Sequence, residues 1–134
     1  MSQVKSSPLV CSGHTRPIPQ VAFSALQPTA GFLLISSCKD GKAMLREGMT
    51  GDWLGTFLGH KGAVWSGKLS EDGSKAVTGS ADFTAKVWDT YTGTATLTLA
   101  HNHIVRSVDI SPKGTHVVTG GQEKKLRLFD LEKP

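Results

Sequence analysis

Short stretches in which apolar and polar residues alternate follow one another along the whole chain. Nine of them are rich in valine, threonine and aromatic residues and predict strands at 21–24, 32–37, 43–47, 63–70, 75–80, 84–89, 105–111, 116–121 and 126–130. Two more strands are expected at 53–58 and 94–99. No long window places apolar residues at the helical spacing i, i+3, i+4, i+7. The pattern therefore predicts an all-β fold.

Glycine, aspartate, serine and proline separate the predicted strands. The stretches SEDGS at 70–74 and SPKGT at 111–115 have the composition of hairpin turns. Each turn places a glycine where a positive φ is required, because glycine adopts that conformation without a steric cost.

The chain repeats itself with a period of about forty residues. Histidines stand at 14, 60 and 101, at intervals of 46 and 41 residues, and each is followed ten residues later by a serine: Ser24, Ser70 and Ser111. A second series is anchored on an acid, with a hydroxyl residue four positions before it and another acid seven positions after it. Its members are Ser36, Asp40 and Glu47; Thr78, Asp82 and Asp89; and Thr119, Glu123 and Asp130. Three units with the same order of special residues indicate an architectural repeat.

Each unit supplies four strands in about 41 residues, which is typical of a β-propeller blade, and the G-H and W-D pairs resemble the WD40 family. The expected fold is three blades of an expected seven, each a four-stranded antiparallel sheet, in an incomplete, open propeller over residues 1–134. The repeats are expected at 14–47, 60–89 and 101–130, with the strands at 53–58 and 94–99 as the fourth strands of successive blades. The family resemblance further implies that residues 8–11 act as a closing strand for a last blade, so this sequence is expected to be a truncated product or a piece of a longer chain.

The resemblance to WD40 proteins also implies a hydrogen-bonded tetrad of His, Ser or Thr, Asp and Trp inside each blade. The complete set in this sequence is His60, Thr78, Asp82 and Trp88. An imidazole N–H can satisfy a carboxylate in a tight turn, and the hydroxyl can join the other ring nitrogen to the indole N–H. Partial sets are His14, Ser36 and Asp40, with Arg46 in place of tryptophan, and His101, Thr119 and Glu123, with Phe129 in that place. These two blades are expected to depend more on apolar packing.

Residues of the same types also occur in catalytic, metal-binding and base-stacking sites. His60, Thr78 and Asp82 are members of a catalytic triad by type, but a triad occurs once and this set recurs. A metal site at His101 and His103 lacks a third ligand. The tryptophans at 53, 65 and 88 suit either a base-stacking platform or packing within the blades, and packing is favoured because each lies in a predicted strand. We therefore expect no catalytic residues, no cofactor and no metal.

Composition adds little to this picture. The chain has 134 residues, a net charge of +4 and two cysteines, Cys11 and Cys38, whose spacing fits no zinc or redox motif and which are expected to be buried. No apolar stretch approaches the length of a membrane span, and the N-terminus lacks the apolar core of a secretory signal. A cytoplasmic or nuclear location is expected.

Longer phrases carry a more specific resemblance. The stretches CSGHTRP, ADFTAKVWD, LAHNHIV and TGGQEKKLRLFDLEKP are similar to the N-terminal part of the serine-threonine kinase receptor-associated family of WD40 proteins, and TGDWLGTFLGHKGAVW is also similar to the related family of subunit I of translation initiation factor 3. The resemblance implies a non-enzymatic scaffold for protein–protein assembly in the survival motor neuron complex, which assembles spliceosomal ribonucleoproteins for mRNA splicing, and in signalling by transforming-growth-factor-β receptors. It implies protein partners in a multi-subunit complex, indirect contact with RNA, no membrane, no small-molecule substrate, and residence in cytoplasm and nucleus.

The family resemblance also indicates where a partner would bind, namely at the loops around each G-H pair and at the residue before each tetrad acid. These positions are Thr15, Pro17, Lys39, Lys61, Ala63, Ala81, Asn102, Ile104 and Gln122. The alternatives that remain open are a component of initiation factor 3, a direct RNA-binding module using the scattered lysines, and a substrate receptor in ubiquitin ligation.

Overall fold

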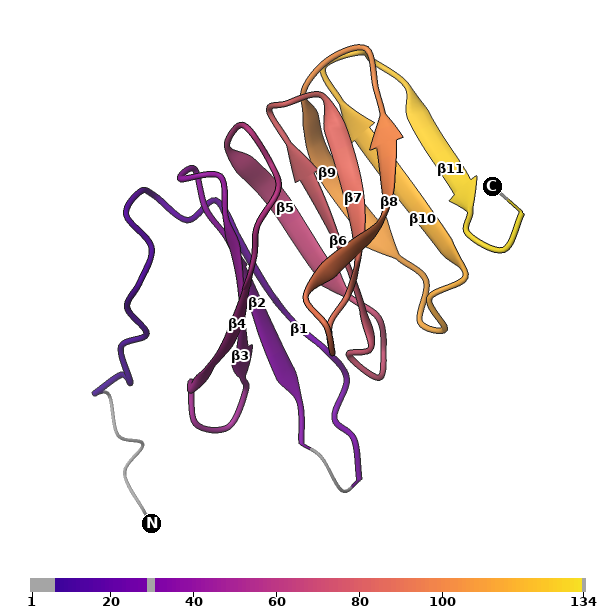
Figure 1. Ribbon diagram of the computed structural model, residues 1–134. Helices are drawn as coiled ribbons and strands as arrows, with labels where there is room; N and C mark the ends of the chain where they lie inside the picture. Colours follow the sequence, from indigo (N-terminus) through magenta and orange to yellow (C-terminus); the bar gives the residue numbers. More distant parts are fainter. Residues whose placement is uncertain (1–6, 29–30, 134) are drawn as a thin grey trace.

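The computed structural model describes residues 7–28 and 31–133, which form eleven antiparallel strands in three sheets (Figure 1). The first sheet, blade one, contains β1 (Gln20–Phe23), β2 (Leu33–Ser37), β3 (Ala43–Glu47) and β4 (Trp53–Phe57) in that order. Blade two contains β5 (Val64–Leu69), β6 (Lys75–Ser80), β7 (Thr84–Asp89) and β8 (Thr94–Ala100). Blade three contains β9 (Val105–Ile110), β10 (His116–Gly121) and β11 (Leu126–Asp130).

All eleven predicted strands are present, and most bounds agree to within a residue or two. The two turn glycines have the predicted conformation, with φ of 75° at Gly73 and 72° at Gly114. The sheets stand face to face as consecutive blades of an open arc (Figure 1). The predicted all-β fold of propeller blades is therefore confirmed.

Two details differ from the prediction. Blade three has three strands instead of four, because the fourth strands of the other blades begin five or six residues after the third strands end, and only residues 131–134 follow Asp130. Residues 8–11, predicted to be a closing strand, belong to no sheet and are exposed. A strand requires a neighbour for its backbone hydrogen bonds, and the neighbour expected here is a blade that the printed sequence does not contain.

Apolar packing between the blades forms two cores. Ile35, Leu45 and Phe57 of blade one pack against Val64 and Trp88 of blade two. The second core joins blades two and three and contains Val77, Ala85, Val87, Val105, Val108, Ile110 and Val117. Complete burial of each valine, leucine, isoleucine or phenylalanine side chain in these cores stabilises the fold by about 1.5–3 kcal/mol, so each blade depends on its neighbour.

The outer faces of the two end blades carry exposed apolar side chains. In β1, Gln20 and Ala22 face blade two, and the alternating residues Val21 and Phe23 point away and are exposed. In β11, Phe129 joins the second core, whereas Leu126 and Leu128 are exposed. We call these two surfaces the end flanks.

The connections between strands lie on two opposite faces of the arc (Figure 1). The upper face carries residues 38–42, 58–63, 81–83, 101–104 and 122–125, together with the segment before β1. The lower face carries the connections β1–β2, β3–β4, β5–β6, β7–β8 and β9–β10. The recurring histidines and the turn acids Asp40, Asp82 and Glu123 lie at the upper face or just below it, whereas the second acids of the repeat, Glu47, Asp89 and Asp130, end their strands on the lower side.

Candidate functional site

Blade two brings together the four side chains of its predicted tetrad. His60 lies in the connection before β5, and its Nδ1 is 2.9 Å from Oδ2 of Asp82 in the β6–β7 turn. On the other side of the ring, Nε2 is 2.6 Å from the hydroxyl of Thr78, and the indole Nε1 of Trp88 donates to the same hydroxyl at 2.9 Å. One arrangement of protons satisfies all three contacts: Nδ1–H donates to Asp82, Nε2 accepts from Thr78, and Thr78 accepts from Trp88.

The carboxylate of Asp82 receives hydrogen bonds from several donors. They include the backbone N–H of Lys61 at 3.0 Å, the backbone N–H of Thr84 at 3.0 Å and the hydroxyl of Thr84 at 2.6 Å. Burial alone would raise the pKa of Asp82, but the hydrogen bonds from Thr84, His60 and Lys61 outweigh burial and lower this pKa to about 2. Burial also lowers the pKa of His60, against the opposing effect of Asp82. A neutral imidazole beside an ionised carboxylate is therefore the form at neutral pH.

The tetrad of blade two joins β6 and β7 to the connection that precedes β5, so it fixes the entry of the chain into its own blade. Each hydrogen bond contributes about 1 kcal/mol, and those to the carboxylate somewhat more. The distances resemble those of a catalytic triad, but the hydroxyl of Thr78 is fully buried and also accepts from Trp88. A substrate has no access to this hydroxyl, so the arrangement serves structure.

Blade one contains three of the four side chains and two of the three contacts. Nδ1 of His14 is 3.3 Å from Asp40, and Nε2 is 2.7 Å from the hydroxyl of Ser36. Arg46, at the tryptophan position, is buried and does not contact Ser36. Its guanidinium donates instead to the carbonyl oxygens of Gly51, at 3.1 Å, and of Ser12. Arg46 therefore binds the N-terminal segment to this blade by hydrogen bonds, where the sequence predicted greater reliance on apolar packing.

Blade three keeps only the contact between histidine and hydroxyl. Nε2 of His101 is 2.7 Å from Thr119, but Nδ1 donates to the carbonyl oxygen of Leu99 at 2.9 Å. Glu123 pairs with Arg127 instead, at 2.6 Å from Nε and 3.0 Å from Nη2, and this pair lowers the pKa of Glu123 to about 2. Phe129 packs its ring edge against His101 with the centroids 5.7 Å apart. The longer side chain of Glu123 therefore pairs with an arginine, where Asp82 pairs with a histidine. Apolar packing of Phe129 takes the place of the indole hydrogen bond.

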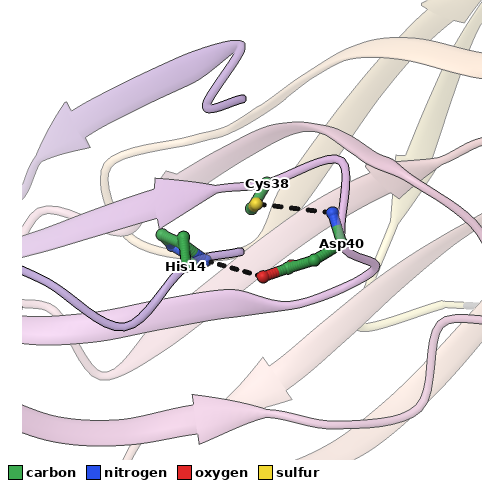
Figure 2. Close-up of side chains that lie close together, drawn as sticks. All are labelled: His14, Cys38 and Asp40. Atoms are coloured by element: carbon green, nitrogen blue, oxygen red, sulfur yellow. Dashed lines mark hydrogen bonds and ion pairs between the residues drawn. The ribbon is translucent and has the colours of Figure 1, made fainter. Parts of the chain in front are cut away.

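Among the described residues, one group of three side chains has the composition of a metal site: His14, Cys38 and Asp40, whose potential ligand atoms lie within 4.8 Å of one another (Figure 2). The thiol of Cys38 donates to the carbonyl of Arg16 at 3.1 Å and accepts from the backbone N–H of Asp40 at 3.3 Å. In blade two, Ser80 makes the two equivalent contacts, to Gly62 and Asp82, both at 3.2 Å.

Cys38 therefore occupies a turn position that a serine fills in blade two, beside the equivalent pair His60 and Asp82. Burial raises the pKa of the Cys38 thiol, which disfavours the thiolate that a metal requires. The group is explained by the repeated turn. His101 and His103 do not form a pair of ligands either, because His103 accepts from the N–H of Ile104 and stacks on Phe83 with the centroids 5.3 Å apart.

The three tryptophans have different environments. Trp88 is buried in the first core, 5.1 Å from the ring of Phe57. Trp53 was expected to pack within a blade, but it is 59% exposed because it begins β4, the outermost strand. Trp65 is half-buried near the upper face, under the side chains of Lys39 and Arg106. Cys11 was expected to be buried and is exposed, whereas Cys38 is buried.

All of the predicted partner-facing positions lie on the upper face. Six are exposed and three, Ala63, Ala81 and Ile104, are half-buried; the exposed ones are Thr15, Pro17, Lys39, Lys61, Asn102 and Gln122. Sequence reasoning missed Trp65 and Arg106, which belong to the same surface. Each stands five residues after a repeat histidine, and this shared spacing would have marked them as equivalent positions.

Comparison with known proteins agrees with this architecture. The family described as "WD domain, G-beta repeat" matches residues 51–89 and 93–130. The chain is 59% identical over 131 residues to the serine-threonine kinase receptor-associated protein of Gallus gallus and 58% identical to that of Homo sapiens, covering 98% of this chain and 37% of each relative. It is 34% identical over 129 residues to eukaryotic translation initiation factor 3 subunit I of Drosophila grimshawi, covering 92% of this chain and 38% of the relative.

The chain thus spans well under half the length of the curated relatives it matches. The described residues contain no helix that is long and apolar enough to cross a membrane. The matched repeats cover more than half of the chain, and their histidine, hydroxyl, acid and tryptophan residues form the contacts described above. The chain belongs to the WD domain, G-beta repeat family.

Proposed function

We propose that this chain is part of a non-enzymatic WD40 scaffold that holds proteins together in a multi-subunit complex. The structure supports a binding role because its recurring polar side chains are used inside the blades, where they order the turns that form the upper face. Catalysis receives no support, since the hydroxyl of the best triad-like set is fully buried.

The complex we propose is the survival motor neuron complex, with roles in spliceosomal ribonucleoprotein assembly and mRNA splicing, and a further role in signalling by transforming-growth-factor-β receptors. The observation that carries this choice is the identity of 58–59% to serine-threonine kinase receptor-associated proteins, against 34% to initiation factor 3 subunit I. The proposed location is the cytoplasm and the nucleus, and the proposed contact with RNA is indirect, through the complex.

The test is quantitative co-purification from cells of the source organism. The protein carrying a tag at its natural locus is captured, and the bound subunits are identified by mass spectrometry with and without ribonuclease. Enrichment of survival motor neuron subunits that survives ribonuclease is expected. A protein that instead sediments with ribosomes and enriches initiation factor 3 subunits would replace this proposal with the translation alternative, and loss of all partners after ribonuclease would favour direct RNA binding.

A variant of the upper face sharpens the test. Lys61→Glu reverses the charge of an exposed side chain on that face, and Lys113→Glu makes the same change on an exposed lysine of the lower face. If partners bind the upper face, the first variant lowers the yield of the subunits and the second leaves the yield unchanged.

A further inference from the structure

Three side chains from three consecutive blades meet at the upper face. Nζ of Lys39, in the β2–β3 turn, lies 4.9 Å from the ring centroid of Trp65 at the start of β5. Cζ of Arg106, at the start of β9, lies 4.0 Å from the same ring. Cation–π contacts of this kind stabilise a cation by about 0.5–1 kcal/mol at an exposed site. We call these three residues the tryptophan clasp.

The two cations of the clasp are exposed, and neither forms an ion pair with a carboxylate of the described residues. Asp40 follows Lys39 in sequence, but its carboxylate is turned toward His14 and the backbone N–H groups of Thr15 and Lys42. Two like charges held against one ring repel each other, and an anion bound nearby would remove that repulsion.

The wider surface has the same sign of charge. The five upper connections contain five lysines and three acids, whereas the five lower connections contain one lysine and three acids. The upper acids are Asp40, Asp82 and Glu123, and each is engaged by a neighbouring histidine or arginine and by backbone N–H groups. These three carboxylates are occupied by hydrogen bonds within the fold, and among the described residues none of them forms an ion pair with a lysine of the upper face.

We propose that the upper face binds an acidic peptide segment of a partner protein, with glutamate or aspartate side chains pairing with Lys39 and Arg106. This inference rests on the proposed scaffold function and adds the chemistry of the partner. The ring of Trp65 holds the guanidinium of Arg106 in place, and a planar guanidinium ordered in advance can pair with a carboxylate through two parallel hydrogen bonds.

A single-stranded RNA is a poorer match for the clasp. RNA-binding platforms stack bases on open aromatic faces. Within the clasp, the ring of Trp65 is half-buried and two cations already lie over it. A carboxylate, in contrast, can bind by pairing with the two cations of the clasp and requires no open aromatic face.

The test is fluorescence anisotropy with a fluorescein-labelled oligoglutamate peptide and, in parallel, a labelled oligouridylate of equal length. The full chain is expected to bind the peptide, with an affinity that falls as salt rises. Arg106→Ala and Lys39→Ala are each expected to weaken binding about tenfold, and Arg106→Lys less. Lys113→Ala, on the lower face, is the matched control and leaves binding unchanged. Circular dichroism of each variant verifies the fold.

Peptide binding that is unchanged in both alanine variants, or oligouridylate binding that is tighter than peptide binding and lost in the same variants, overturns the inference. The outcome is separable from that of the scaffold proposal. Survival motor neuron subunits that co-purify with a chain unable to bind oligoglutamate would refute the acidic peptide alone. Oligoglutamate binding at the clasp without those subunits would refute the named complex and leave the clasp intact.

Discussion

The hydroxyl of Thr78 offers the sharpest test of the tetrad. Replacing Thr78 by valine keeps the volume and removes the hydroxyl, so that no cavity complicates the result. The change removes the contacts of 2.6 Å to His60 and 2.9 Å to Trp88. It also leaves the indole N–H of Trp88 without an acceptor in a side chain that is 1% exposed. An unsatisfied buried donor costs about 1–3 kcal/mol, and with the lost bond to His60 we expect Thr78→Val to lower the free energy of unfolding by about 3 kcal/mol.

Blade three provides a matched control within the same chain. Thr119 is also buried and bonded to a histidine, but Phe129 stands where blade two has Trp88. Thr119→Val therefore leaves one buried hydrogen-bonding group without a partner instead of two. We expect this change to lower the free energy of unfolding by about 1.5 kcal/mol. In urea, at a typical slope of about 2 kcal/mol per molar, the midpoints would fall by about 1.5 M and about 0.7 M.

The assay is urea unfolding followed by far-ultraviolet circular dichroism at low protein concentration. Trp88→Phe completes a double-mutant cycle with Thr78→Val. Because each change removes one partner of the same hydrogen bond, the double variant is expected to lose about 1 kcal/mol less than the sum of the two single losses. Two results together would refute the idea that the tetrad side chains stabilise the fold cooperatively. These are equal losses of unfolding free energy in Thr78→Val and Thr119→Val, and a double variant whose loss equals the sum of the two single losses.

Three further predictions concern pH, the thiols and the end flanks. The pKa of His60 is lowered in the folded state, so the contribution of His60 to stability is present above its ordinary pKa of about 6.5 and is lost as pH falls below that value. The pKa of Asp82 is lowered to about 2, so the contribution of Asp82 to stability is lost between about pH 4 and 2. Urea midpoints measured from pH 7 to 3 should therefore fall continuously, and midpoints that rise on acidification would contradict this sign. In the native protein one thiol should react rapidly with a thiol reagent, because Cys11 is exposed while Cys38 is buried with a raised pKa; two rapidly reacting thiols would show that the β2–β3 turn opens. Finally, the 134-residue polypeptide should self-associate through its end flanks, and charged substitutions at the four exposed flank residues should return it to a monomer in analytical ultracentrifugation, whereas a chain monomeric from the start would contradict this prediction.

The strands and the tetrad of blade two could be predicted because both are recorded in spacing along the chain. A strand alternates every two residues whatever its neighbours are. The tetrad residues recur at fixed intervals because each blade repeats the same turns. Ser80 and Cys38 show the strength of this rule, since different side chains make equivalent contacts at equivalent positions.

The remaining features depend on contacts that spacing does not record. Glu123 is one methylene group longer than Asp82, and it pairs with Arg127 instead of with the histidine. Trp53 and Cys11 are exposed because of what lies beside an outer strand and an N-terminal segment. The tryptophan clasp joins residues of three blades, and their proximity follows only from the packing of the sheets.

The boundaries of the family repeat are displaced from those of the sheets. The repeat at 93–130 begins with β8, which lies in blade two, and ends with β11 in blade three. The first strand of each sequence repeat therefore forms the fourth strand of the preceding blade. The fourth strand of a repeat's own blade comes from the repeat that follows. Tandem duplication of such a unit adds a complete sheet without a new kind of junction, because the donated strand always finds a sheet that lacks one. Blade three, with three strands, is the acceptor that such a donation would complete.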